Sequence, residues 1–323
     1  MPAFFLARGS NLSDFCSKRD ELIRRAGNVA GSNEHDEGSL VVKARPGMPN
    51  AAEIAYWNDE PGARWAALHE RIDRAFATLS AAGLAVAAAG PGEVVLDVGC
   101  GTGVTSLALA ASVTGAGSVT AVDISRPMVA VAEERARALA LGNVRFVLAD
   151  AAVHRFAERA YDLVFSRFGV MFFDDPAGAF ANIRPALHPG GRLVFVCWRE
   201  LAANPWIHVL TAAVRPHVPA QPKAGPEEPG PLSFADPERV RALLGRAGFR
   251  DVTFAAVDAE LPFGTRAAAC EFLSKIGPAS RLLDGANERE RDAALRALDA
   301  ALNPHERDGD VLLGAGVWIV SAH

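Results

Sequence analysis

One ten-residue stretch restricts the fold of this chain more than any other. Residues 94–103 read Val-Val-Leu-Asp-Val-Gly-Cys-Gly-Thr-Gly, an apolar run followed by three alternating glycines. A short run of aliphatic residues bounded by turn residues predicts a parallel strand buried on both faces. The glycines allow a tight turn into a helix whose first backbone N–H groups can contact a ligand. The stretch therefore predicts a βα unit with a ligand-binding loop.

The chain after this stretch continues to alternate between strand-like and helix-like segments. We expect further strands at 118–122, 144–148, 162–165, 192–197, 252–257 and 311–320, with helices at 103–112, 126–141, 176–187 and 202–218. Repeated βα units require a parallel sheet covered by helices on both faces. The predicted fold class is therefore α/β, with a Rossmann-like, seven-stranded, mostly parallel sheet.

Three regions are expected along the chain. Residues 1–47 are polar and glycine-rich after position 27 and predict a mobile N-terminal extension. Met48 is then a candidate translation start, and a genuine extension is the alternative. Residues 48–90 predict helices ahead of the first strand. Residues 91–323 predict the main domain, with helical lid insertions at 202–231 and 266–302.

Composition and charge exclude several classes of protein. The 33 basic and 38 acidic residues give a net charge of −5, and no long basic block is present to neutralise phosphates, so nucleic-acid binding is not expected. The four cysteines are far apart, which indicates no metal site or disulfide framework but reduced thiols in a cytoplasmic protein. Glycines interrupt the longest uncharged run, 98–122, so we expect no membrane span.

Two aspartates follow the predicted strands at the spacing that a nucleoside ligand requires. Asp123 ends the second strand, where a carboxylate can accept both ribose hydroxyls. Asp150 ends the third strand and can accept from the exocyclic amine of a base, with Ile124 against the face of the ring. A helix N-cap or a solvated loop is the other role open to each aspartate. Val104 stands where a dinucleotide fingerprint has its last glycine, which disfavours nicotinamide and flavin dinucleotides.

Taken together, these motifs resemble those of the class I S-adenosylmethionine-dependent methyltransferases. The resemblance covers roughly residues 51–323 and is carried, in the family's order, by 95–103, 122–125, 148–151, 161–164 and 187–191. Residues 166–175, with Trp198 after the fifth strand, resemble most the bacterial small-molecule subgroup that includes quinone-biosynthesis methyltransferases.

The resemblance implies a cofactor and a set of residues that bind it. The cofactor is S-adenosyl-L-methionine, and helices within 48–90 are expected to cap it. Anchoring these helices on the domain is the alternative role for their aromatic residues. The implied cofactor-binding residues are Tyr56, Trp57, Trp65, Asp97, Gly99, Gly101, Asp123, Ile124, Asp150, Ala151 and Ser166.

The implied reaction makes modest demands on the protein. The sulfonium group makes the methyl group electrophilic, so the chain has to align a small-molecule acceptor for in-line displacement and exclude water. A hydroxyl acceptor would benefit from a general base, for which His208 and His154 are the candidates, and Arg167 can contact the acceptor. A structural or solvated histidine and a loop salt bridge are the alternatives.

Two other classes of function are alternatives to methyl transfer. A short-chain dehydrogenase shares the alternating βα order, but neither tyrosine of this chain has a lysine four residues later. A non-catalytic module that binds the cofactor or a partner on the same fold stays open. Substrate choice depends on the insertions rather than on the fold, so the sequence predicts a small-molecule acceptor without specifying it.

Overall fold

The computed structural model describes residues 49–220, 225 and 228–323. The predicted extension 1–47, Met48 and part of the predicted 202–231 insertion lie outside these residues. The described chain begins with four short helices rather than one long one: α2 (Ala51–Trp57), α3 (Glu60–Ala67), α4 (His69–Ala75) and α5 (Ala77–Ala87). Pro61 in the first turn of α3 is compatible with a helix start but not with a continuous helix from α2.

A single sheet forms the centre of the molecule. Its strands run in the order β3-β2-β1-β4-β5-β8-β6, and the first five of these are parallel. β8 is antiparallel to both β5 and β6, and the two-residue β7 pairs with β8. The predicted seven-stranded, mostly parallel sheet is confirmed. The strands are β1 (Val94–Val98), β2 (Ser118–Asp123), β3 (Val144–Leu148), β4 (Tyr161–Arg167), β5 (Leu187–Trp198), β6 (Thr253–Pro262), β7 (Glu306–Arg307) and β8 (Asp310–Ala322).

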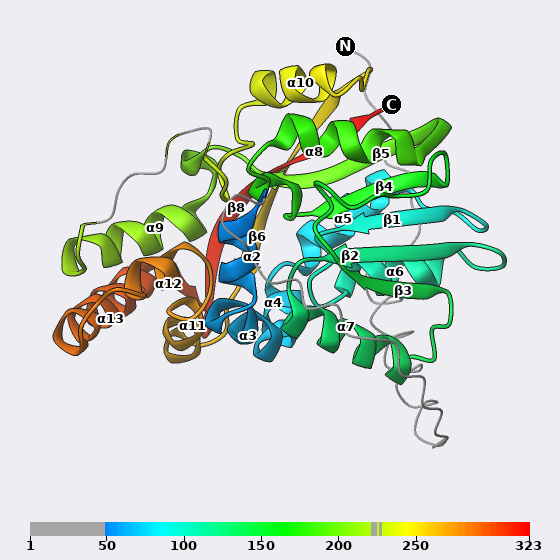
Figure 1. The fold of residues 1–323 in the computed structure, drawn as a ribbon. Coiled ribbons are helices and arrows are strands. Elements are labelled where there is room, and N and C mark those ends of the chain that lie inside the picture. The colour runs from blue at the N-terminus through cyan, green and yellow to red at the C-terminus, as the bar shows by residue number, and fades with distance from the viewer. Residues whose placement is uncertain (1–48, 221–224, 226–227) are drawn as a thin grey trace, which may run out of the picture.

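Helices cover both faces of the sheet, as Figure 1 shows. Successive residues of a strand point to opposite faces. Phe195 of β5 packs on Phe180 of α8 with ring centroids 5.8 Å apart, whereas the next residue, Val196, lies against Gly83 of α5. α8 and α5 therefore cover opposite faces. The helices that follow the strands are α6 (Val104–Ser112), α7 (Arg126–Ala138), α8 (Pro176–Ile183) and α10 (Pro237–Arg246).

The two insertions gather at one side of the sheet, beside α2 and α3 (Figure 1). The predicted helical stretch 266–302 is three helices, because Gly277 has a φ of 68° and Asn287 begins a new helix with a capping box. The insertion helices are α9 (Pro205–Val214), α11 (Arg266–Leu273), α12 (Gly277–Leu283) and α13 (Glu288–Leu302).

Prolines shorten two of the helices that the sequence predicts. The helix expected at 176–187 ends at Ile183, and the helix expected at 202–218 is only α9, because a proline within a helix removes a backbone donor. Short 3-10 turns continue the chain at these places. They are η1 (Val170–Phe172), η2 (Arg184–Ala186), η3 (Leu201–Ala203), η4 (Arg215–His217) and η5 (Asn303–His305).

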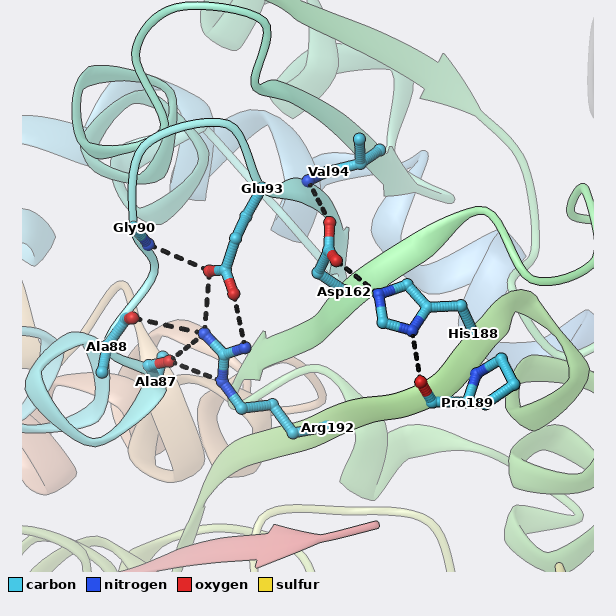
Figure 2. A network of polar contacts seen from close by, with 9 residues as sticks. All are labelled: Ala87, Ala88, Gly90, Glu93, Val94, Asp162, His188, Pro189 and Arg192. Carbon is cyan, nitrogen blue, oxygen red and sulfur yellow. Dashed lines mark hydrogen bonds and ion pairs between the residues drawn. The ribbon is translucent and has the colours of Figure 1, made fainter.

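A polar network ties together the amino-terminal ends of β1, β4 and β5 (Figure 2). Arg192 pairs with Glu93 through two contacts of 2.8 and 2.9 Å and donates to the carbonyl oxygens that end α5. Asp162 accepts from the backbone N–H of Val94 at 2.7 Å and from His188. These contacts fix the register of three strands at the end of the sheet that is remote from the glycine loop.

Candidate cofactor and acceptor site

A cavity of about 1070 Å³ opens at the carboxyl ends of the parallel strands. This is the edge of an open α/β sheet at which ligands bind. The glycine loop and the ends of β2 and β3 line one part of it, and α2, α9, α12 and the segments 167–173 and 228–233 line much of the rest. The predicted site residues that line this cavity are Tyr56, Trp57, Trp65, Gly99, Gly101, Asp123, Ile124, Asp150, Ala151, Arg167 and His208.

The glycine loop takes a conformation that other residues would strain. Gly99, Gly101 and Gly103 all have positive φ angles, between 54° and 83°. A Cβ atom on Gly99 would lie 2.7 Å from the Cα of Gly169, which begins the turn after β4. The loop thus lies directly on the end of β4, and its backbone forms part of the cavity wall.

Asp123 holds the loop in place and also faces the cavity. Its Oδ2 accepts from the backbone N–H of Gly101 at 2.7 Å, and its Oδ1 accepts from the N–H of Ser125 at 2.8 Å. Burial raises the pKa of Asp123, and these backbone hydrogen bonds oppose that shift. Because each carboxylate oxygen can accept more than one hydrogen bond, both oxygens retain capacity for a ligand's hydroxyl groups.

Asp150 has a partner that the sequence did not reveal. The side chain of Asn50, just ahead of α2, donates from Nδ2 to both carboxylate oxygens of Asp150 at 2.9 Å. Oδ1 also accepts from the N–H of Ala152 at 2.9 Å. Burial raises the pKa of Asp150, partly offset by these hydrogen bonds. An asparagine ahead of a helix is a recognisable N-cap signal, but its contact 100 residues away is not predictable from one sequence.

Asp97 and Ser166 lie beneath the glycine loop and do not line the cavity. Oδ2 of Asp97 accepts from Thr105 Oγ1 at 2.8 Å and from Ser106 Oγ at 2.6 Å. Burial raises the pKa of Asp97 to about 6. Its Oδ1 and the Ser166 hydroxyl have no hydrogen-bond partner among the described residues. Both residues are fully buried, so these are costly polar atoms to leave unpaired.

Arg167 brings a positive charge to the same region. Its Nη1 donates to Ser80 Oγ at 3.1 Å, and its Nε has no partner among the described residues. Burial lowers the pKa of Arg167, although the charges of Asp73 and Asp97 oppose this. No carboxylate of the described residues forms an ion pair with this buried guanidinium, so an anionic ligand beside it would be favoured.

The helices ahead of β1 are fastened to the βα loop after β2. The Asn58 side chain donates to the carbonyl of Ile124 at 2.8 Å and accepts from the N–H of Arg126 at 3.0 Å. Ser125 Oγ donates to the carbonyl of Trp57 at 2.7 Å. The Trp57 ring then meets those of Trp65 and Phe172 edge to face at 5.6 and 5.9 Å. Trp57 and Trp65 therefore both anchor the helices and line the cavity.

Arg281 connects the second insertion to α2. Its guanidinium lies 4.1 Å from the centre of the Tyr56 ring, its Nε donates to the Tyr56 hydroxyl at 3.1 Å, and its Nη2 is 3.8 Å from Glu53 Oε2. Burial raises the pKa of Glu53, and the charge of Arg281 opposes the shift. This contact closes the cavity between α2 and α12.

The part of the cavity beyond the glycine loop is largely aromatic. Phe168 stacks on Trp198 at 4.1 Å, and Phe76 and Trp206 pack around this pair. His208 lines the cavity from α9, together with Thr211, Ala212 and Arg215 on the same helix face. His154 does not line it: its backbone bonds to Asp150 and its ring packs on Phe156. The structure therefore brings only His208 of the two predicted histidines to the cavity.

Neither a membrane span nor a metal cluster is found in the part of the chain that the structure describes. No helix there is long and apolar enough to cross a membrane, and no group of three or more candidate metal-ligating side chains occurs.

Comparisons with known proteins agree with this geometry. Residues 95–191 match the family model described as "Methyltransferase domain". The aklanonic acid methyltransferase DauC of Streptomyces sp. is 36% identical over 104 residues, which are 32% of this chain and 47% of the relative. The demethylmenaquinone methyltransferase of Thermus thermophilus is 40% identical over 100 residues, 31% of this chain and 44% of the relative.

A solved structure extends the likeness to the fold. The YcgJ protein from Bacillus subtilis has a TM-score of 0.51 at 17% identity, and the match covers 76% of this chain and 97% of that one. The chain spans about half the length of the two curated relatives named above. The sequence match lies on the strands and loops that build the cavity, and over residues 95–191 the chain is similar to methyltransferases.

Proposed function

We propose that this protein transfers a methyl group from S-adenosyl-L-methionine to a small-molecule acceptor by in-line displacement. The observation that carries the proposal is the presence of Asp123 and Asp150 on one cavity wall, with the glycine loop beside them. Asp123 would receive the ribose hydroxyls and Asp150 the adenine amine, with Ile124 against the ring.

The polar atoms beneath the glycine loop support the same cofactor. Arg167 lines the cavity and has an unpaired Nε, whereas the unpaired oxygens of Asp97 and Ser166 are buried behind the cavity wall, at the ends of β1 and β4. The carboxylate of an amino-acid moiety would complement the Arg167 guanidinium. When bound, the cofactor supplies an electrophilic methyl group. The chain's own residues bind it, orient it and exclude water.

The acceptor is proposed to lie in the aromatic part of the cavity. Phe168, Trp198 and Trp206 give that part an apolar wall, which would exclude water from a bound acceptor, and His208 is the titratable side chain of α9 that faces it. His208 is the candidate general base for a hydroxyl acceptor.

The described cysteines are unpaired, which supports a reducing cytoplasmic location.

The proposal is tested by binding and turnover together. Calorimetry with S-adenosylhomocysteine should show one site per chain. Incubation with methyl-labelled S-adenosylmethionine and a metabolite extract should yield a labelled small molecule, identified by mass spectrometry. Tight binding without labelling of any acceptor would favour the non-catalytic module, and absence of binding would overturn the proposed methyl transfer.

A further inference from the structure

Asn50 is a buried polar residue that contacts both Asp150 and Asp174. It is 3% exposed, lines the cavity and lies immediately ahead of α2. Its φ of 54° is in the left-handed region, which asparagine and glycine adopt more readily than other residues. The contacts of this buried side chain therefore require a functional or structural reason.

The orientation of the Asn50 amide is fixed by its partners. Oδ1 accepts from the backbone N–H of Asp174 at 2.7 Å, and Nδ2 donates to both oxygens of the Asp150 carboxylate. The backbone N–H of Asn50 also donates to Asp174 Oδ2 at 2.6 Å. A carboxylate only accepts and an N–H only donates, so the reversed amide would lose these bonds. Asn50 thus presents a fixed donor to Asp150.

These contacts leave Asp150 with a defined remaining acceptor position. Oδ1 accepts from both Asn50 and Ala152, whereas the contact with Asn50 is the one that Oδ2 makes among the described residues. Since each carboxylate oxygen has two lone pairs, Oδ2 keeps one of them for a further donor. Without Asn50, the Ala152 N–H would be the one donor among the described residues that holds the Asp150 carboxylate, and the carboxylate could rotate.

We propose that Asn50 is a positioning residue for purine recognition. It holds the Asp150 carboxylate so that Oδ2 accepts from the 6-amino group of adenine and disfavours a 6-oxo group, which would place an oxygen against it. This inference rests on the proposed function, because it assumes an adenine ring at Asp150. Discrimination between adenine and a 6-oxo purine would then depend on Asn50, ahead of α2, as well as on Asp150, after β3.

The test compares two ligands that differ at one group of the base. Calorimetry would measure the binding of S-adenosylhomocysteine, with a 6-amino group, and of S-inosylhomocysteine, with a 6-oxo group. The variant is Asn50→Gly, because glycine keeps the left-handed backbone while removing the amide. The control is Asn58→Ala, which loosens the other end of α2 without a contact to Asp150.

The two variants should differ in selectivity. Asn50→Gly should weaken S-adenosylhomocysteine roughly tenfold and change S-inosylhomocysteine by less than about twofold, as when one charge-assisted hydrogen bond is lost. Asn50→Asp places a carboxylate oxygen against Asp150, and its affinity for S-adenosylhomocysteine should fall by at least the same factor. Asn58→Ala should weaken both ligands by the same factor.

Two results would overturn the role of Asn50 while leaving the proposed function standing. If Asn50→Gly weakens both ligands equally, Asn50 only anchors α2. If it binds S-adenosylhomocysteine more tightly, Asn50 competes with adenine for Asp150. Failure of the wild-type protein to bind S-adenosylhomocysteine would overturn the proposed function and this inference together.

Discussion

Asp123 illustrates how single side chains in this protein hold the site and face the ligand at once. Asp123→Ala should weaken S-adenosylhomocysteine binding by about 1.5–3 kcal/mol, because the proposed charge-assisted hydrogen bonds to the ribose would be lost together with the bond from the Gly101 N–H. Asp123→Asn keeps an acceptor oxygen, so its binding free energy for S-adenosylhomocysteine should fall by less. Calorimetry on both variants checks this, and an unchanged dissociation constant in the alanine variant would remove the ribose assignment.

The buried carboxyl of Asp97 should leave a signature in the pH dependence of stability. Burial raises its pKa to about 6 from the ordinary value of 3.8, so the folded state binds more protons than the unfolded state between these values. Its contribution to the free energy of unfolding is fully present below pH 3.8 and is lost as pH rises through 6, by at most about 3 kcal/mol. Denaturant unfolding of the ligand-free protein from pH 4 to 8 should show this fall relative to Asp97→Asn. Parallel curves for the two proteins would contradict it.

At this scale the sequence predicts the residues at strand ends but not their partners. Asp123 and Asp150 could be located because a carboxylate after a parallel strand always lies at the same edge of the sheet. Asn50 could not, since its contacts with Asp150 and Asp174 join segments at least 100 residues apart. His154 and His208 show the same difference: spacing alone did not separate the histidine that faces the cavity from the one that packs on Phe156.

Among the elements, the close approach of α2 and α3 depends on one glycine. A Cβ on Gly62 would lie 1.9 Å from the carbonyl oxygen of Trp57, which is backbone and cannot move aside without shifting α2. Gly62→Ala should therefore lower the free energy of unfolding by about 1–3 kcal/mol and weaken S-adenosylhomocysteine binding.

The matched control for this change is Gly245→Ala in α10. Apart from its two chain neighbours and the backbone of its own helix, no heavy atom of the described residues lies within 4 Å of the position of its added Cβ. Alanine is the better helix former, so this variant should be as stable as the wild type or slightly more stable, by up to about 1 kcal/mol. Thermal melts of both variants test the pair, and equal destabilisation would show that contact with Trp57 is not the cause.

The tryptophans of α2 and α3 should report ligand binding. Trp57 and Trp65 line the cavity, whereas Trp318 lies elsewhere and donates to the Ala235 carbonyl at 3.0 Å. S-adenosylhomocysteine should change the emission of the wild-type protein and of Trp318→Phe, and this change should largely vanish in the Trp57→Phe, Trp65→Phe double variant. A full ligand response in the double variant would place the ligand away from these helices.

The element boundaries that sequence reasoning missed share a physical cause. β1, β2 and β3 were predicted closely, since buried aliphatic runs between glycines and polar turns define them. The stretch 266–302 has helical composition throughout, yet it is three helices. Composition alone does not show where a chain turns to pack on α9 and α2, which is a tertiary constraint.

At the scale of the whole molecule, one end of the sheet carries a stabilising polar network and the other end carries the cavity. The network of Arg192, Glu93, Asp162 and His188 lies at the amino-terminal ends of the strands, opposite the cavity (Figure 2). Changes there should alter stability and leave ligand affinity unchanged, which melts and calorimetry on His188→Ala can test. A weakened affinity would show that the two ends are coupled.

The pH dependence of that network follows from two opposite shifts. The hydrogen bond that His188 donates to Asp162 raises the pKa of His188, so the histidine's contribution to stability is present below its unfolded pKa of about 6.5 and is lost as pH rises through the folded value. Burial acts to raise the pKa of Asp162, but hydrogen bonds from Val94 and His188 hold it lower, so its contribution is lost in acid. The melting temperature difference between wild type and His188→Ala should therefore be largest near pH 5–6 and fall by about pH 9. A difference that does not vary with pH would contradict the ion pair.

The position of β8 within the sheet has a consequence for how the chain is made. β8 is the last strand in the sequence, yet it lies between β5 and β6, and Trp198 pairs with Val317 about 120 residues later. Synthesis proceeds from the amino terminus. The edges of β5 and β6 that pair with β8 therefore stay unpaired until residues 310–322 have left the ribosome. A nascent chain stalled before that point exposes two open strand edges, and these are what a chaperone or another nascent copy would encounter first.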